Sequence, residues 1–205
     1  MKQGKFITLE GGEGLGKTTN LAFIQHFLIE QGREVVVTRE PGGTVLAEKL
    51  RALLLETQGE LISDKTELLL LFAARAQHIH NVIQPALTRG AWVLSDRFTD
   101  ATYAYQGGGR GIDVATIAWL EQFVQASLQP DLTLLFDAPV ELGMQRAKKR
   151  AALDRFESEQ QAFFRHVRAA YLERAQQQSE RIKLIDASQS LAAVQLRIQQ
   201  WLETL

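Results

Sequence analysis

A glycine-rich segment near the N-terminus constrains the fold more than any other part of the chain. Residues 11–18 read GGEGLGKT, which fits the pattern G-x-x-x-x-G-K-[ST], and they lie between a predicted strand, Phe6–Glu10, and a predicted helix, Thr18–Gln31. In this context the glycines let the backbone wrap around phosphate oxygens, and the helix adds the positive end of its dipole. The segment therefore predicts a phosphate-binding loop.

The loop also predicts what its side chains do. We expect Lys17 to reach the β- and γ-phosphates of a nucleoside triphosphate and the hydroxyl of Thr18 to bind Mg²⁺. The residues assigned to the triphosphate are Gly11, Gly12, Glu13, Gly14, Leu15, Gly16, Lys17, Thr18 and Thr19. The pattern by itself indicates a nucleoside triphosphate and does not say which enzyme binds it.

The rest of the chain alternates short apolar runs with helical segments. Four further runs end at turn signals and predict strands: Glu34–Thr38, Ala91–Asp96, Leu132–Asp137 and Ile182–Asp186. The segments with helical character are Thr44–Glu56, Lys65–Arg89, Val114–Leu128, Val140–Arg150, Glu157–Gln178 and Leu191–Leu205. This alternation predicts a single α/β domain over residues 1–205, a P-loop NTPase-type three-layer sandwich with a five-stranded parallel sheet and helices on both faces.

Composition excludes several classes of protein. The 205 residues include no cysteine, so disulfides, thiolate catalysis and Cys-ligated zinc or Fe–S sites are excluded. The net charge of −1 indicates neither a nucleic-acid partner nor a polybasic membrane contact. No apolar run approaches the ~20 residues that span a bilayer, and Met1–Leu9 is too short for a signal peptide. We therefore expect a cytoplasmic protein.

Two carboxylates are candidates for the Mg²⁺ side of the site. Asp96 and Asp137 each end a predicted buried strand, and ligands collect at the carboxyl edge of an open parallel sheet. We favour Asp96 and keep Asp137 as the alternative. The chain contains no Asn-Lys-x-Asp segment, so a GTPase switch is not expected.

Arginines at the same edge indicate the reaction class. Arg39 and Arg97 follow predicted strands, and Arg51 and Arg75 lie on predicted helices. Guanidinium groups suit a bidentate grip on phosphate, and a phosphate acceptor needs no base because its second pKa is about 6. The arginines therefore favour a nucleoside monophosphate kinase. Glu40 leaves a deoxynucleoside kinase open as the alternative, since it is placed to act as a base on a hydroxyl. A P-loop module that hydrolyses ATP only to change shape is the alternative from another class.

Several motifs at fixed spacings carry a specific resemblance. They are LEGGEG from residue 9, TREPGGT at 38–44, FAAR at 72–75, DRF at 96–98, AYQGGGRG at 104–111, PDLT at 130–133 and LDR at 153–155. By this combination the sequence resembles the bacterial thymidylate kinase family, in its Escherichia-like type, over essentially the whole chain. The resemblance implies ATP- and Mg²⁺-dependent phosphorylation of dTMP to dTDP, in dTTP biosynthesis, by a homodimer whose contacts involve the second and third helices.

The resemblance also implies roles around the monophosphate acceptor. Phe72 stacks on thymine and Arg75 hydrogen-bonds the base; Leu71 is the alternative for stacking, because family members often space the two residues by four. The other residues that the resemblance places on the acceptor side are Glu10, Arg39, Glu40, Pro41, Arg51, Arg97, Thr102, Tyr105 and Gln106. Of these, Arg97 grips the acceptor phosphate, Tyr105 lies near the sugar, and Glu10 lies near the phosphate and the metal.

A basic segment completes the expected site. The phosphate-binding loop contains no arginine, so the resemblance implies that a lid near residues 143–157 supplies one. Arg146 and Arg150 lie on one helical face, and either is a candidate to close over the γ-phosphate. Arg155 and Gln189 are expected on the ATP side. The four histidines show no metal-ligand spacing, and we expect them to be structural or surface residues.

Overall fold

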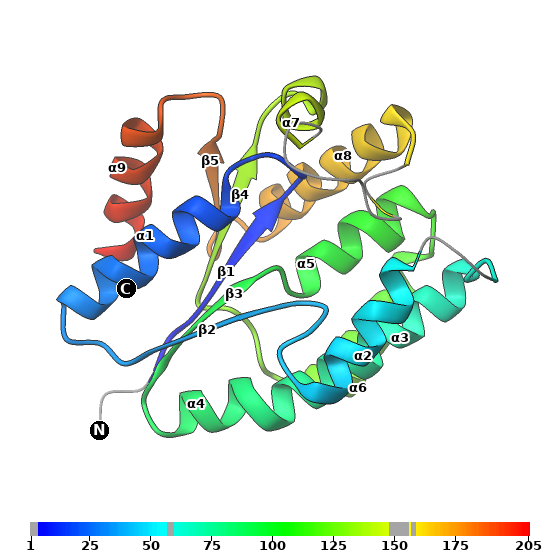
Figure 1. Ribbon diagram of the computed structural model, residues 1–205, viewed down its shortest axis with the longest axis horizontal. Coiled ribbons are helices and arrows are strands. Elements are labelled where there is room, and N and C mark those ends of the chain that lie inside the picture. Colours follow the sequence, from blue (N-terminus) through cyan, green and yellow to red (C-terminus); the bar gives the residue numbers. More distant parts are fainter. Residues whose placement is uncertain (1–3, 57–59, 148–155, 157–158) are drawn as a thin grey trace.

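A parallel sheet of five strands forms the centre of the protein. The computed structural model describes residues 4–56, 60–147, 156 and 159–205 (Figure 1). The strands are β1 (Phe6–Gly11), β2 (Val35–Arg39), β3 (Trp92–Asp96), β4 (Leu132–Asp137) and β5 (Ile182–Asp186). They lie in the order β2-β3-β1-β4-β5, and every pair is parallel. The predicted fold class and all five predicted strands are confirmed, with ends that agree to within one residue.

Helices connect the strands in the expected alternation. Their bounds are α1 (Lys17–Glu30), α2 (Val45–Leu55), α3 (Asp64–His78), η1 (Ile79–Ile83), α4 (Gln84–Thr88), α5 (Thr99–Thr102), η2 (Tyr103–Gly109), α6 (Val114–Gln125), α7 (Val140–Ala147), α8 (Gln161–Gln177) and α9 (Leu191–Leu202). Side chains of Thr44, Ser63, Asp113 and Ser190 cap α2, α3, α6 and α9 by accepting hydrogen bonds from backbone N–H groups.

The two faces of the sheet carry separate hydrophobic cores. Successive residues of a strand point to opposite faces, so Ile7 of β1 packs with Ile24 of α1 and with α9, whereas Phe6 packs with Ile83 on the face covered by η1 and α4. Helix α8 and η2 cover the rest of that second face. In Figure 1 α1 and α9 lie side by side on one side of the sheet. The three-layer arrangement follows from this division.

The predicted helix Lys65–Arg89 is interrupted. The structure has α3 as far as His78, then the π-helical turn η1, and then α4. Pro85, near the start of α4, has no N–H to donate to a carbonyl one turn earlier. The wider π turn directly before it accommodates that lost hydrogen bond.

Residues 99–109 form α5 and the π-helical η2, although they lay outside the predicted elements. Glycines 107–109 disfavour a helix in isolation. In the structure they let η2 approach α8: a Cβ on Gly108 would lie 2.6 Å from the Cβ of Ala170, and one on Gly109 would lie 2.4 Å from the ring of Phe163. The glycine run thus admits a neighbouring helix.

No helix within the described part of the chain is both long enough and apolar enough to cross a membrane.

Candidate active site

The phosphate-binding loop joins β1 to α1 at the carboxyl edge of the sheet. Its glycines Gly11, Gly14 and Gly16 have φ angles of 125°, 72° and 84°, which side-chain-bearing residues rarely adopt. Gly16 is the N-cap of α1 and offers no side chain to the first helical N–H groups. Those groups therefore remain available to an anion. The ammonium group of Lys17 donates to the carbonyls of Gly11, at 3.0 Å, and Gly12, at 2.7 Å.

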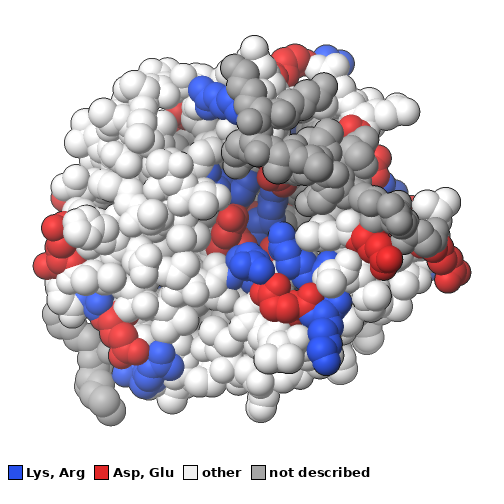
Figure 2. All heavy atoms as spheres, in the orientation of Figure 1, with Lys and Arg blue, Asp and Glu red and all other residues white. Residues whose placement is uncertain are grey.

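A cavity of about 170 Å³, called here the outer cavity, opens over this loop. Its lining brings together residues from the loop, from β2, from α2 and from the end of β3, namely Glu13, Gly14, Leu15, Gly16, Lys17, Thr18, Arg39, Glu40, Arg51, Asp96 and Arg97. Figure 2 shows Lys and Arg side chains gathered in a hollow at the centre of this face. Six of the nine predicted phosphate-binding residues, 13–18, and three of the predicted arginines thus meet in one place.

A second cavity of about 90 Å³, called here the inner cavity, adjoins the first. The two share four lining residues: Glu13, Glu40, Arg51 and Arg97. The rest of the inner cavity is lined by Pro41, Leu55, Leu71, Arg75, Phe98, Ala101, Thr102, Tyr105, Gln106 and Phe156. An anionic group that lies where the cavities join is therefore beside both Arg51 and Arg97.

Arg97, at this junction, has a strained backbone. Its φ angle of 70° is left-handed, which costs a residue other than glycine about 1–3 kcal/mol. The strain is supported by neighbours: the Arg97 N–H donates to the Leu9 carbonyl at 2.9 Å, Ser95 Oγ donates to the Arg97 carbonyl at 2.7 Å, and the next N–H, of Phe98, donates to Glu10 at 2.7 Å. Strain of this kind collects at functional sites.

The guanidinium of Arg97 is held by three side chains. It donates to Glu13, to the hydroxyl of Tyr105 at 3.0 Å and to the hydroxyl of Tyr171 at 3.1 Å. Burial acts to raise the pKa of Glu13, but the charges of Arg97 and Lys17 lower it to about 2. Glu13 is therefore ionised at neutral pH and balances part of the positive charge of the site.

Glu10 lies beneath the junction and is fully buried. Its Oε1 accepts from the Phe98 N–H, and its Oε2 accepts from the Tyr171 hydroxyl at 2.7 Å. Burial, with the nearby charge of Asp100, raises the pKa of Glu10 to about 8 against the opposing effect of Arg97. At neutral pH this carboxyl group is therefore largely uncharged and takes little positive charge away from Arg97.

In the inner cavity, Arg75 is fixed by a buried ion pair. Its Nε donates to Glu40 at 2.7 Å, and its Nη2 donates to Thr102 Oγ1 at 2.9 Å. Glu40 also contacts Nδ1 of His78 at 2.9 Å, and the other ring nitrogen of His78 contacts Thr38 Oγ1 at 2.6 Å. Buried Nη1 of Arg75 has no hydrogen-bond partner among the described residues. Since buried donors are normally paired, this N–H is available to an acceptor on a ligand.

The outer cavity also contains groups that suit Mg²⁺. Oδ1 of Asp96 is buried and has no hydrogen-bond partner among the described residues, and Thr18 lines the same cavity. Mg²⁺ prefers oxygen ligands and is usually held by one or two carboxylates together with substrate phosphates. Asp96 and Thr18 therefore fit the ion. Asp137, the alternative, is instead paired with Arg168 through two hydrogen bonds of 2.7 and 2.9 Å.

Comparison with known proteins places the chain in a family. The family model described as thymidylate kinase matches residues 9–198. The chain belongs to the thymidylate kinase family. Thymidylate kinase of Pseudomonas entomophila is 64% identical over 195 residues, which cover 95% of this chain and 93% of that protein. The enzyme of Alcanivorax borkumensis is 56% identical over 202 residues, which cover 98% and 97%. A crystal structure of thymidylate kinase from Ehrlichia chaffeensis, 33% identical, superimposes with a TM-score of 0.80 over 98% of this chain and 99% of that chain.

For a thymidylate kinase, the prediction that Phe72 stacks on the base needs correction. Phe72 is buried in a core with Leu68, Tyr103, Ile117 and Leu120, and it does not line the inner cavity. Leu71, the alternative, lines that cavity instead. Successive helix residues point about 100° apart, so Leu71 and Phe72 face different surroundings. The Phe72 ring lies beneath the Arg75 guanidinium, 4.9 Å from centroid to carbon, on the core side.

The structure describes three of the predicted ATP-side residues outside the core of the loop: Arg146, Gln189 and Thr19. Arg146, predicted to close over the γ-phosphate, donates to the Ala187 carbonyl at 2.9 Å, in the turn that follows β5. Gln189 lies in the same turn and donates to Asp186 at 2.8 Å. Thr19 is exposed in the first turn of α1. The predicted residues Arg150 and Arg155, and most of the predicted lid, lie outside the described residues.

Two residues of this site were not predicted from the sequence. Tyr171, on α8, joins Arg97 to Glu10 across 74 and 161 positions of sequence, and His78 supports Glu40. For Tyr171 no local pattern was available. For His78 the only signal is its place three residues after Arg75, which puts the two side chains on one face of α3.

Proposed function

We propose that this thymidylate kinase transfers the γ-phosphoryl group of ATP to the phosphate of dTMP, giving dTDP and ADP for dTTP biosynthesis. The single observation that carries the proposal is the pair of cavities that share Arg51 and Arg97. One cavity lies over the phosphate-binding loop and the other is lined by groups that suit a nucleoside. Two anionic nucleotides can thus meet end to end beside shared positive charge.

On the donor side, the loop amides and Lys17 hold the phosphates of ATP. In the structure Lys17 binds two loop carbonyls, and it exchanges these contacts for phosphate oxygens when ATP binds. Asp96 and Thr18 would hold Mg²⁺, which would neutralise charge that develops during transfer.

On the acceptor side, Arg97, Arg39 and Arg51 hold the monophosphate of dTMP. One of its oxygens attacks the γ-phosphorus, a new P–O bond forms, and the bond to the leaving ADP breaks. Since the acceptor is already mostly a dianion at pH 7, no base has to remove a proton. This favours the phosphate acceptor over thymidine, because both carboxylate oxygens of Glu40, the base required for a hydroxyl, are taken up by Arg75 and His78.

The inner cavity supports a pyrimidine base at its far end. Arg75, whose buried Nη1 N–H has no hydrogen-bond partner among the described residues, lines this cavity with Leu71, Thr102 and Gln106. A carbonyl of the base accepts from that N–H, and the apolar side chain of Leu71 packs on the ring. Tyr105, held at Arg97, lies where the sugar joins the phosphate. This end of the site therefore recognises a nucleoside monophosphate and not phosphate alone.

We propose in addition that a lid near residues 143–157 supplies an arginine, Arg146 or Arg150, to the γ-phosphate and excludes water, which competes as an acceptor. The loop itself has no arginine that could do so. For Arg146 to reach the γ-phosphate, it has to leave the Ala187 carbonyl. The cytoplasmic location predicted from the sequence remains part of the proposal.

A homodimer completes the proposal. Helices α2, α3 and α6 lie side by side at one side of the molecule (Figure 1). Their exposed large apolar residues are Val45, Leu46, Leu53, Leu69, Val114, Trp119 and Phe123. Large apolar side chains exposed on neighbouring helices favour a contact with another protein, and a second copy of the chain is the partner that the family resemblance implies.

An ADP-release assay with dTMP, dUMP, dCMP, AMP and thymidine as acceptors tests the proposal. We expect dTMP to give the fastest turnover and thymidine to give none above the background without acceptor. Phosphorylation of thymidine would instead support the deoxynucleoside kinase. ATP turnover that ignores every added acceptor would support a regulatory module.

A further inference from the structure

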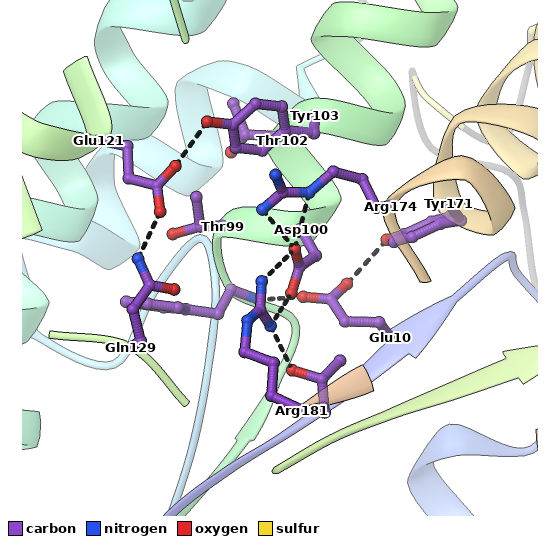
Figure 3. Close-up of polar contacts among 12 residues, drawn as sticks. Glu10, Thr99, Asp100, Thr102, Tyr103, Glu121, Gln129, Tyr171, Arg174 and Arg181 are labelled. Carbon is purple, nitrogen blue, oxygen red and sulfur yellow. Dashed lines mark hydrogen bonds and ion pairs between the residues drawn. The ribbon is translucent and has the colours of Figure 1, made fainter. Parts of the chain in front are cut away.

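A buried carboxylate, Asp100 of α5, joins three parts of the fold beneath the inner cavity. Its Oδ1 accepts from Arg174 of α8 at 2.9 and 3.1 Å, and its two oxygens accept from Arg181, which precedes β5, at 2.7 and 2.9 Å. Arg181 also donates to Thr133 of β4 at 2.9 Å. Figure 3 shows the two guanidinium groups pointing at Asp100 from different sides. One carboxylate thus ties α5 to α8 and to the sheet.

The side chains of this cluster are well shielded from water. The exposed fractions are 3% for Asp100, 14% for Arg174 and 13% for Arg181. Burial acts to raise the pKa of Asp100, but the hydrogen bonds and charges of the two arginines lower it overall, so the carboxylate is ionised. Buried ion pairs often stabilise a protein no more than apolar side chains of equal size. What the cluster adds is directional: five N–H groups with fixed angles hold three backbone elements in one relative position.

That position determines where the acceptor-side residues lie. Asp100 is three residues after Arg97 and two before Thr102. On α8, Tyr171 lies three residues before Arg174, so both side chains are on one face of that helix. Helix α8 therefore binds Asp100 through Arg174 and also presents the Tyr171 hydroxyl that accepts from Arg97. The guanidinium of Arg174 additionally stacks on the ring of Tyr103, 3.8 Å from its centroid. The cluster and the site therefore share both α5 and α8.

We propose that Asp100, together with Arg174 and Arg181, is a positioning element for the monophosphate acceptor: it holds α5 and α8 in the arrangement that directs Arg97 and Tyr105 at the junction of the two cavities. None of the three residues lines either cavity, so they act through Arg97 and its partners. The inference rests on the proposed function only in taking that junction as the binding place of the acceptor phosphate.

The proposal predicts an effect on one substrate and not on the other. Thr102, Tyr105 and Gln106, which line the inner cavity, all lie on α5 and η2, the segment that the cluster fixes. The phosphate-binding loop lies on β1 and α1, which Asp100 does not contact through any hydrogen bond within the described residues. Binding of dTMP is therefore expected to depend on the cluster, and binding of ATP is not.

Two variants test this. Asp100→Asn keeps the size and one acceptor oxygen but removes the charge and turns an NH₂ group toward two guanidiniums. Arg174→Lys keeps the charge but loses the planar two-point contact with Asp100 and the stacking on Tyr103. We expect Asp100→Asn to raise the KM and the calorimetric Kd for dTMP about tenfold or more, since a shift of an ångström in a binding group is enough for that. The KM for ATP stays within about twofold. Arg174→Lys gives a smaller change in the same direction, and it supplies the test if Asp100→Asn does not fold.

Ile198→Ala is the matched control, because Ile198 is buried on α9, on the other face of the sheet. We expect it to lower the Tm while leaving the KM for dTMP unchanged. If the Asp100 and Arg174 variants also lower only the Tm, or raise both KM values equally, the cluster is a stabilising element and the proposal is wrong. Absence of dTMP-dependent ADP release by the unmodified protein is a different result, since it overturns the proposed function before any variant is compared.

Discussion

At the scale of single residues, the site depends on how charge is divided around Arg97. Glu13 is ionised and touches the guanidinium, Glu10 is close by but mostly protonated, and two tyrosines supply neutral acceptors. Glu13 thus balances only one of the two positive charges of Arg97 and Lys17. This is the condition under which an acceptor dianion binds next to ATP without strong repulsion.

Replacing Arg97 by alanine is expected to lower kcat/KM for dTMP by about 100-fold or more, because a buried phosphate-binding charge is lost and Glu13 keeps its own charge unpaired. Steady-state kinetics with dTMP varied at saturating ATP measure the effect. Arg97→Lys, which keeps the charge but not the three-way contact, is the control and should lose less. Near-normal kinetics of the alanine variant would reject the role of Arg97.

The raised pKa of Glu10 predicts a dependence of stability on pH. Between the ordinary pKa of 4.5 and the folded value of about 8, the folded protein binds a proton that the unfolded chain has released. The free energy of unfolding therefore falls as the pH rises through this window and levels off above it. Glu10→Gln, which imitates the protonated form, should remove this part of the decline. Urea unfolding of both proteins from pH 5 to 9 makes the comparison, and parallel curves would contradict it.

Local patterns predicted some of these residues and not others. The phosphate-binding loop was predictable because its residues are consecutive and their spacing reflects the chemistry directly. Leu71 and Phe72 could not be ranked in the same way, because both are apolar neighbours and only the packing of α3 decides which one faces the cavity. Tyr171 could not be predicted as a site residue, since its partners lie in distant parts of the chain and no sequence spacing relates them.

At the scale of elements, strands were easier to predict than the connections between them. Buried parallel strands are apolar throughout and end at turn residues, so their bounds follow from the sequence. The helix over residues 99–109 does not, because three glycines oppose it and only the contact with α8 repays the cost. The π turn before Pro85 is a similar case. The sequence shows the proline, but it does not predict that the backbone forms a π turn in front of it.

The tight contact between η2 and α8 predicts that alanine at two adjacent glycines has different effects on the free energy of unfolding. In Gly108→Ala the new Cβ would lie 2.6 Å from the Cβ of Ala170 and 2.9 Å from a backbone oxygen, so we expect a loss of about 1–3 kcal/mol in the free energy of unfolding. In Gly107→Ala the nearest atom is a side-chain methyl of Ile117 at 3.3 Å. That variant should be neutral or slightly stabilising, because alanine favours a helix. Chemical denaturation of both variants decides, and equal effects would disprove the packing argument.

At the scale of the whole molecule, the apolar surface of α2, α3 and α6 remains to be accounted for. Trp119 and Phe123 of α6 are 65% and 75% exposed, and their rings are stacked with centroids 5.6 Å apart. Two large, exposed aromatic side chains with parallel rings are costly to leave in water. A second copy of the chain would cover them.

We therefore expect Phe123→Asp to convert a dimer into a monomer, as measured by size-exclusion chromatography with light scattering. The matched control is Leu196→Asp, which places the same charge on an exposed leucine of α9, away from this surface. It should leave the dimer intact. A wild-type protein that is monomeric at every concentration tested would contradict the proposed homodimer.

The pairing of β1 with β3 has a consequence for the geometry of transfer. Leu9 of β1 lies opposite Asp96 of β3. The phosphate-binding loop follows β1, and Arg97 follows β3. The backbones of the phosphate-binding loop and of Arg97 thus start from neighbouring hydrogen-bonded strands, one step of about 4.8 Å apart. We therefore expect substitutions at the far end of the inner cavity to alter which base is accepted without moving these two backbone segments apart.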